Sequence, residues 1–163
     1  MGHISFSTAL PWVAAAVIVA TLSSQRPWLV ANATPSEPRG LYVGVPASPA
    51  VGRLVAFQAP AAALPYAGGL PLLKTVAAGP GDLVCASSGR LAINRVDRGP
   101  IARVDHQGRP LPQWSGCRPM RPDELFVFSD RVPNSFDSRY FGPVPRNQVL
   151  GVYVRVPLIS EQP

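Results

Sequence analysis

Proline is the residue that most restricts how this chain can fold. It occupies 20 of the 163 positions, about 12% against roughly 5% in an average protein. The prolines are spread over the whole length, which leaves little room for long helices, because proline fixes φ and lacks a backbone donor. Hydrophobic residues make up 47% and charged residues 15% of the chain, a balance too apolar for disorder. We therefore expect a mainly β protein whose prolines separate short strands and loops.

The length suits one domain with an appendage. The run Phe6–Leu22 carries no charge, is interrupted by Pro11 and is just long enough to span a bilayer. We expect residues 1–27 to form an N-terminal membrane anchor with one transmembrane helix, and residues 28–163 to form an extracytoplasmic domain. A cleaved signal peptide is the alternative, because Ala31-Asn32-Ala33 has the small-x-small form of a cleavage site.

The charge does not indicate a nucleic-acid partner. The net charge is +6 and the pI is near 10.2, but the arginines are scattered and no basic run is interleaved with aromatic residues. The two cysteines lie 32 residues apart, which fits no metal motif, and no glycine-rich phosphate loop appears. The sequence implies no cofactor and no metal site.

Residues 32–42 hold the candidate nucleophile, Ser36. Pro35 and Pro38 disfavour the helical region for the residues that precede them, so we expect an extended stretch. Side chains two apart on an extended backbone point the same way, which would bring the hydroxyls of Thr34 and Ser36 to one site. Taken alone, the stretch also fits an ordinary Ser/Thr/Pro loop.

Lys74 is the candidate base. It is the only lysine among 15 basic residues, and it lies within the apolar run 70–78. Burial in such a strand would lower the pKa of an amine by as much as ~3–5 units, so that it could accept a proton. Arginine cannot do this, because it stays protonated at any useful pH. Chance placement of the lysine is the alternative.

Apolar runs predict strands at 41–45, 52–58, 70–78, 83–85, 90–96 and 124–130. A hairpin over 101–111 would put His106 in an exposed turn, which makes a Ser/His/Asp triad the weaker enzyme hypothesis. In the loop after residue 130, Asp137 and Arg139 are placed to form an ion pair, and Ser135 is a serine that could orient a lysine amine.

Three segments in this order resemble type I signal peptidases: Thr34-x-Ser36-x-Pro38-x-Gly40-Leu41-Tyr42, Leu73-Lys74 with Gly79-Pro80-Gly81-Asp82, and Ser135-Phe136-Asp137-Ser138-Arg139-Tyr140-Phe141-Gly142-Pro143. The segment Gly108–Arg118 is similar to one in the branch of that family that processes pilins for conjugal transfer. Ser129-Asp130-Arg131-Val132 replaces the Gly-Asp-Asn-Arg of general signal peptidases, which also favours the conjugal branch.

The resemblance implies a signal-peptidase-like β-barrel/β-ribbon catalytic domain, anchored in the bacterial inner membrane and facing the periplasm. It also implies a serine endopeptidase with these site residues: Ser36 as nucleophile, Lys74 as base, Asp137 as a further catalytic residue, Thr34 with the Ser36 N–H as oxyanion hole, and Ser135 and Arg139 as supporting residues.

The implied substrate is a pilin or other exported precursor of a conjugative transfer or type IV secretion apparatus, cut between small residues. The resemblance further implies that the pilin's own amine can attack the acyl-enzyme and close a ring. The alternatives are a general type I signal peptidase and a non-enzymatic exported β domain. A self-cleaving repressor is disfavoured, because it would need a DNA-binding helical module ahead of the β domain.

An exported domain with two cysteines also predicts a disulfide between Cys85 and Cys117. The alternative is two unrelated cysteines buried as small hydrophobic residues.

Overall fold

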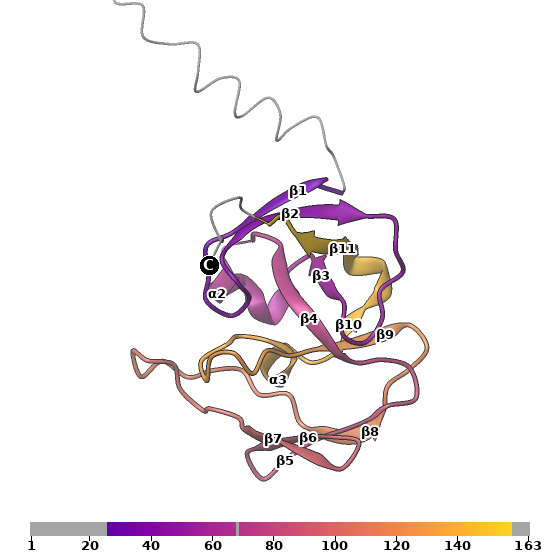
Figure 1. The fold of residues 1–163 in the computed structure, drawn as a ribbon. Helices are drawn as coiled ribbons and strands as arrows, with labels where there is room; N and C mark the ends of the chain where they lie inside the picture. Colours follow the sequence, from indigo (N-terminus) through magenta and orange to yellow (C-terminus); the bar gives the residue numbers. More distant parts are fainter. Residues whose placement is uncertain (1–25, 68, 158–163) are drawn as a thin grey trace, which may run out of the picture.

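A computed structural model describes residues 26–67 and 69–157 as a mainly β fold (Figure 1). The larger sheet has seven antiparallel strands in the order β1-β2-β11-β3-β4-β9-β10. Their bounds are β1 Leu29–Asn32, β2 Gly40–Val45, β3 Leu54–Phe57, β4 Leu72–Ala78, β9 Glu124–Val127, β10 Val144–Pro145 and β11 Val149–Arg155. The mainly β prediction is confirmed.

The smaller sheet has four antiparallel strands in the order β7-β6-β5-β8 and lies below the larger one in Figure 1. Its strands are β5 Leu83–Ser87, β6 Arg90–Ile93, β7 Val96–Pro100 and β8 Gly116–Pro119. The helical segments have three or four residues each: η1 Ala61–Ala63, α2 Leu64–Ala67, α3 Ser138–Phe141 and η2 Arg146–Gln148. Such short elements are what a chain punctuated by prolines permits.

Within residues 26–67 and 69–157, no helix combines the length and the apolar character needed to cross a membrane. The predicted anchor run, Phe6–Leu22, lies outside the described residues. The anchor and the boundary after residue 27 therefore stay predictions.

β4 and β9 belong to the cores on both faces of the larger sheet. The register of β4 against β9 shifts between Val76 and Ala78, so Val76 packs in one hydrophobic cluster and Ala78 in another. In β9, Leu125 and Val127 contact the first cluster and Phe126 the second. Packing on both faces fixes the position of β4, the strand that carries Lys74.

The predicted strand over 90–96 is wrong, because the structure divides it into β6 and β7. Asn94 and Arg95 form the turn between them, with φ values of 50° and 67°. Two successive residues with positive φ suit the right-handed twist of a tight hairpin. Asn-Arg is a weaker turn signal than Asn-Gly, and the apolar alternation on both sides made the segment look continuous.

The predicted hairpin over 101–111 is reduced to one antiparallel bridge between Val104 and Pro110. His106 is exposed in the turn between them, as expected.

Cys85 and Cys117 lie opposite each other in the register of β5 and β8, and a disulfide bond joins them. In the chain-entropy account, closing this loop stabilises the domain by roughly 3–4 kcal/mol.

The disulfide predicts how many thiol groups can be labelled. Protein purified from the cell envelope without reductant and then denatured should take up no thiol label, and it should take up two labels after reduction. Mass spectrometry measures both numbers. Two labels before reduction would show that the cysteines are free.

Candidate active site

Ser36 lies in the connection between β1 and β2 and is only 5% exposed. The backbone turns at Pro35 and Ser36 rather than running fully extended as predicted. The expected meeting of the two hydroxyls nevertheless occurs, with Thr34 Oγ1 and Ser36 Oγ 3.3 Å apart.

The side chain of Asn32 shapes this turn. Its Oδ1 accepts hydrogen bonds from the Thr34 N–H at 3.1 Å and from the Thr34 hydroxyl at 2.8 Å. Its Nδ2 donates to the carbonyl oxygens of Thr34, Glu37 and Pro38 at 3.0, 3.0 and 3.1 Å. One amide therefore holds both ends of the segment that carries Ser36, a role the sequence did not reveal.

Two further contacts join the turn to the sheet. Glu37 is buried, and its Oε1 accepts hydrogen bonds from the N–H and the hydroxyl of Thr75 at 2.9 and 3.0 Å. The hydroxyl of Ser129, also buried, donates to the carbonyl oxygen of Ser36. Because Thr75 follows Lys74 in β4, the Glu37 contact ties the turn to the strand that carries the lysine.

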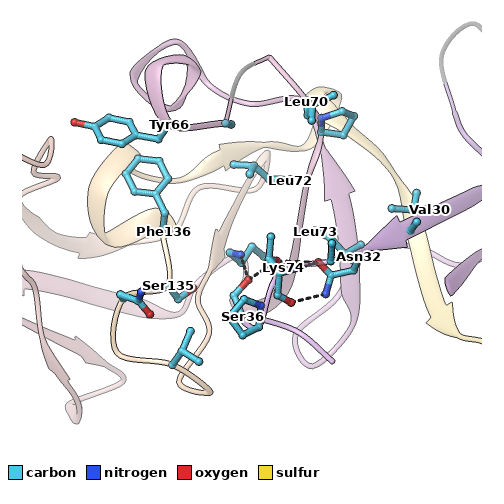
Figure 2. A pocket seen from close by; sticks show the side chains of 18 residues that line it. Val30, Asn32, Ser36, Tyr66, Leu70, Leu72, Leu73, Lys74, Ser135 and Phe136 are labelled. Carbon is cyan, nitrogen blue, oxygen red and sulfur yellow. Dashed lines mark hydrogen bonds between the residues drawn. The ribbon is translucent and has the colours of Figure 1, made fainter. Parts of the chain in front are cut away.

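Lys74 is 4% exposed and lies opposite Val55 in the pairing of β3 with β4. Its Nζ donates a hydrogen bond of 2.6 Å to Ser36 Oγ (Figure 2). Burial lowers the pKa of the Lys74 amine, and the charge of Arg139 lowers it further, whereas Asp137 and Glu37 oppose this change. The amine is therefore easier to deprotonate than that of an exposed lysine.

The predicted ion pair of Asp137 and Arg139 is present and buried, with the two side chains 0% and 5% exposed. Asp137 caps α3; its Oδ1 accepts from Arg139 Nε at 2.8 Å and its Oδ2 from Nη2 at 2.9 Å. Asp137 Oδ2 also accepts from the Ser129 N–H at 3.3 Å, and Arg139 Nη2 donates to the Ser135 carbonyl oxygen at 2.8 Å. The pair thus supports the segment of Ser129, which contacts Ser36, and the segment of Ser135, which lines the same pocket as Ser36.

The roles predicted for Ser135 and Thr34 stay predictions. Ser135 is 2% exposed and lines the same pocket as Lys74, but its hydroxyl has no hydrogen-bond partner among the described residues. The Thr34 hydroxyl donates to Asn32, so it must rotate before it can donate to an oxyanion.

The pocket around Ser36 and Lys74, which we call the catalytic groove, has a volume of about 430 Å³. Its walls are largely apolar and come from residues 30–36, 66–67, 70–74, 132 and 134–136. The sequence also predicts apolar walls that keep water out, made of Leu41, Tyr42, Leu72, Leu73, Phe136 and Phe141. Of these residues, Leu72, Leu73 and Phe136 line the groove, whereas Leu41, Tyr42 and Phe141 do not. Tyr66 is a wall residue that the sequence did not suggest.

Two strand edges border the catalytic groove. β1 is the first strand of its sheet, and within the described residues it pairs only with β2. β4 pairs with β9 at Val76 and Ala78 but not at Leu72–Lys74. An extended peptide could pair with these free backbone groups while its side chains enter the groove.

The arrangement suits acyl transfer. A buried amine with a lowered pKa is in hydrogen-bond contact with a serine hydroxyl, which is the geometry of a general base and its nucleophile. The backbone beside Ser36 is held by three separate side chains, Asn32, Glu37 and Ser129, so the Ser36 hydroxyl is positioned in advance.

Comparisons with known proteins give the same kind of chemistry. Residues 3–157 match a family model described as signal peptidase, peptidase S26. The chain is 34% identical over 84 residues to the plasmid transfer protein TraF of Escherichia coli, covering 50% of this chain and 48% of that protein. This chain thus spans about half the length of that relative.

It is also 35% identical over 139 residues to the conjugal transfer protein TraF of Agrobacterium tumefaciens, covering 74% of this chain and 77% of that protein. A crystal structure of a signal peptidase I from Enterococcus faecalis superposes with a TM-score of 0.41 at 22% identity, covering 65% of this chain and 97% of that one.

Proposed function

This chain belongs to the signal peptidase family, peptidase S26, and on that premise we propose that it is a serine peptidase in which Ser36 is the nucleophile and Lys74 the general base. The observation that carries the proposal is the 2.6 Å hydrogen bond between Lys74 Nζ and Ser36 Oγ inside a buried site. The lowered pKa of the amine supports the same roles.

The first half of the reaction forms an ester. Neutral Lys74 accepts the Ser36 proton, and the serine oxygen attacks the carbonyl carbon of the scissile bond. The Ser36 N–H and the Thr34 hydroxyl, once rotated, stabilise the oxyanion. The intermediate then collapses: the C–N bond breaks, and the protonated Lys74 gives its proton to the leaving amine. In the second half, Lys74 takes a proton from water, which attacks the ester carbon. The C–O bond to Ser36 then breaks, and Lys74 returns the proton to the Ser36 oxygen.

The substrate we propose is an exported precursor, such as a pilin, cut after a small residue. The shape of the catalytic groove supports this, because an extended chain paired with its two free edges would point alternate side chains into shallow apolar pockets. The relatives named as conjugal transfer proteins support a role in conjugation over general secretion. A membrane anchor ahead of a periplasmic domain is part of the same proposal.

Ring closure is the second outcome we propose for the acyl-enzyme. Leu70, Leu72 and Phe136 give the catalytic groove apolar walls, which reduce competition from water when an amine attacks the ester. If the attacking amine is the N-terminus of the same acyl chain, the product is cyclic.

Coexpression with a pilin-like precursor tests the peptidase function. We expect the wild-type chain to cut the precursor and Ser36→Ala to leave it whole, because removal of a nucleophile abolishes the ester step. Ser48→Ala, a change at an exposed serine outside the groove, is the matched control and should cut normally. Intact-mass spectrometry of the product is the measurement.

Cleavage by Ser36→Ala would overturn the assignment of the nucleophile. The same spectra decide the fate of the ester, because a ring is one water lighter than the linear product and has no free N-terminus. If active enzyme gives only the linear product, the proposal of ring closure is overturned and the proposed processing peptidase remains.

A further inference from the structure

A second pocket, with a volume of about 440 Å³, adjoins the catalytic groove. The two share Thr34, Tyr66, Asn134 and Phe136, so these residues lie on the boundary between them. The other walls of the second pocket come from the loop 102–111 and from Tyr140 of α3. We call it the side pocket.

Aromatic rings form a fixed wall between the groove and the side pocket. Tyr66 stacks on Phe136 with ring centroids 4.7 Å apart, and Phe136 stacks on Tyr140 at 5.2 Å. The Tyr66 hydroxyl donates to the Pro110 carbonyl oxygen at 2.7 Å, which joins α2 to the loop 102–111. Stacking and this hydrogen bond hold together three segments that are distant in the sequence.

The position of this wall indicates which half of a substrate reaches it. Figure 2 shows Tyr66 and Phe136 on one side of the Ser36–Lys74 pair, with Val30 and Asn32 of β1 on the other. The acyl half of the substrate, which forms the ester, must stay bound in place while water attacks. Backbone pairing with the free edges of β1 and β4 would keep it bound, so we place the acyl half at the β1 end of the groove. The leaving half then runs toward the side pocket.

The lining of the side pocket indicates an apolar occupant. Ala102, Val104 and Leu111 line it together with the three rings. The polar residues of its lining are Thr34, Asp105, His106, Arg109 and Asn134. Its one carboxylate, Asp105, is already engaged: Oδ2 accepts from Arg109 Nε at 2.6 Å, and Oδ1 accepts from the N–H groups of Gln107 and Arg109 at 2.8 and 2.9 Å. This carboxylate is not free to select a cationic side chain.

We propose that the side pocket binds a large apolar or aromatic side chain of the substrate on the leaving side of the cut, and so determines specificity there. The proposal rests on the peptidase function argued above. An aromatic ring suits the site, because it stacks on aromatic neighbours and contributes a large buried area. Small residues would then be selected on the acyl side, and a large apolar residue would be selected on the leaving side.

The test uses the full chain in detergent and a synthetic library of random peptides, with cut sites read by mass spectrometry. We expect large apolar residues on the leaving side to be enriched about tenfold over background, within the range that single apolar contacts give. Ala102→Trp, at an exposed alanine that lines the side pocket, should reduce that enrichment about tenfold. Ala50→Trp, at an exposed alanine that lines neither pocket, should behave as wild type.

A second pair of variants keeps the test informative if Ala102→Trp does not fold. Val104→Asp places a charge in the side pocket, and Val51→Asp is its control; the two valines are 52% and 55% exposed. Val104→Asp should also remove the apolar preference while the preference for small acyl-side residues persists.

The side-pocket proposal is overturned if cleavage shows no preference for the leaving-side residue, or if both Ala102→Trp and Val104→Asp retain that preference. Either result leaves the proposed peptidase function standing. If the wild-type chain cuts no peptide, or cuts only peptides that Ser36→Ala also cuts, the peptidase function itself is overturned. The side-pocket proposal is then overturned with it.

Discussion

Replacing Lys74 with arginine should abolish cleavage of the precursor as completely as replacing it with alanine. A general base contributes about 10²–10⁴-fold to the rate, and a guanidinium cannot accept a proton near neutral pH. Positive charge is therefore not what the site needs. Initial rates of precursor cleavage by the purified variants measure the effect, with circular dichroism to confirm that each variant is folded.

The pH profile of the wild-type enzyme provides an independent check. Below the pKa of Lys74 the amine is protonated and cannot act as a base, so activity falls as the pH falls through that value. Because burial lowers this pKa, activity should be retained at a pH where an exposed lysine is still protonated.

The Lys74 variants give the result that would contradict this role. If Lys74→Arg cleaves the precursor faster than Lys74→Ala does, Lys74 is not the general base.

Removing one partner of the buried pair Asp137–Arg139 costs about 3–5 kcal/mol of unfolding free energy. In Arg139→Ala the fully buried carboxylate of Asp137 loses the two side-chain donors at 2.8 and 2.9 Å and the positive charge beside it. Urea denaturation followed by fluorescence gives the free energy. The matched control is Arg90→Ala, which breaks an exposed pair with Asp97 whose side chains are 57% and 56% exposed, and should leave the free energy of unfolding almost unchanged, because water and salt screen such a pair.

The same substitution should slow cleavage in whatever fraction stays folded. Asp137 accepts a hydrogen bond from the Ser129 N–H, and the Ser129 hydroxyl donates one to the carbonyl oxygen of Ser36. If Asp137 shifts when Arg139 is removed, Ser129 and then Ser36 should be displaced as well. A cost in Arg139→Ala no larger than in Arg90→Ala would mean that the buried pair is not a structural support.

The sequence predicted well whatever depends on neighbours along the chain. Prolines limit element length wherever they occur, so short strands followed from composition. The Asp137–Arg139 pair was predictable because the residues are two apart in one loop. Local patterns failed where the local signal was weak. The turn at Asn94 and Arg95 was missed because neither residue is glycine, although both have positive φ.

Ser36 and Lys74 were recognisable in the sequence as a candidate pair, but only the tertiary structure brings them together across 38 positions. It also decided their supports: Glu37 on Thr75, Ser129 on the Ser36 carbonyl, and the amide of Asn32 within the turn. The stacking of Tyr66 on Phe136 has the same origin. Strand register and sheet packing create these contacts, and a single polar or aromatic residue carries no periodic pattern that would reveal its distant partner.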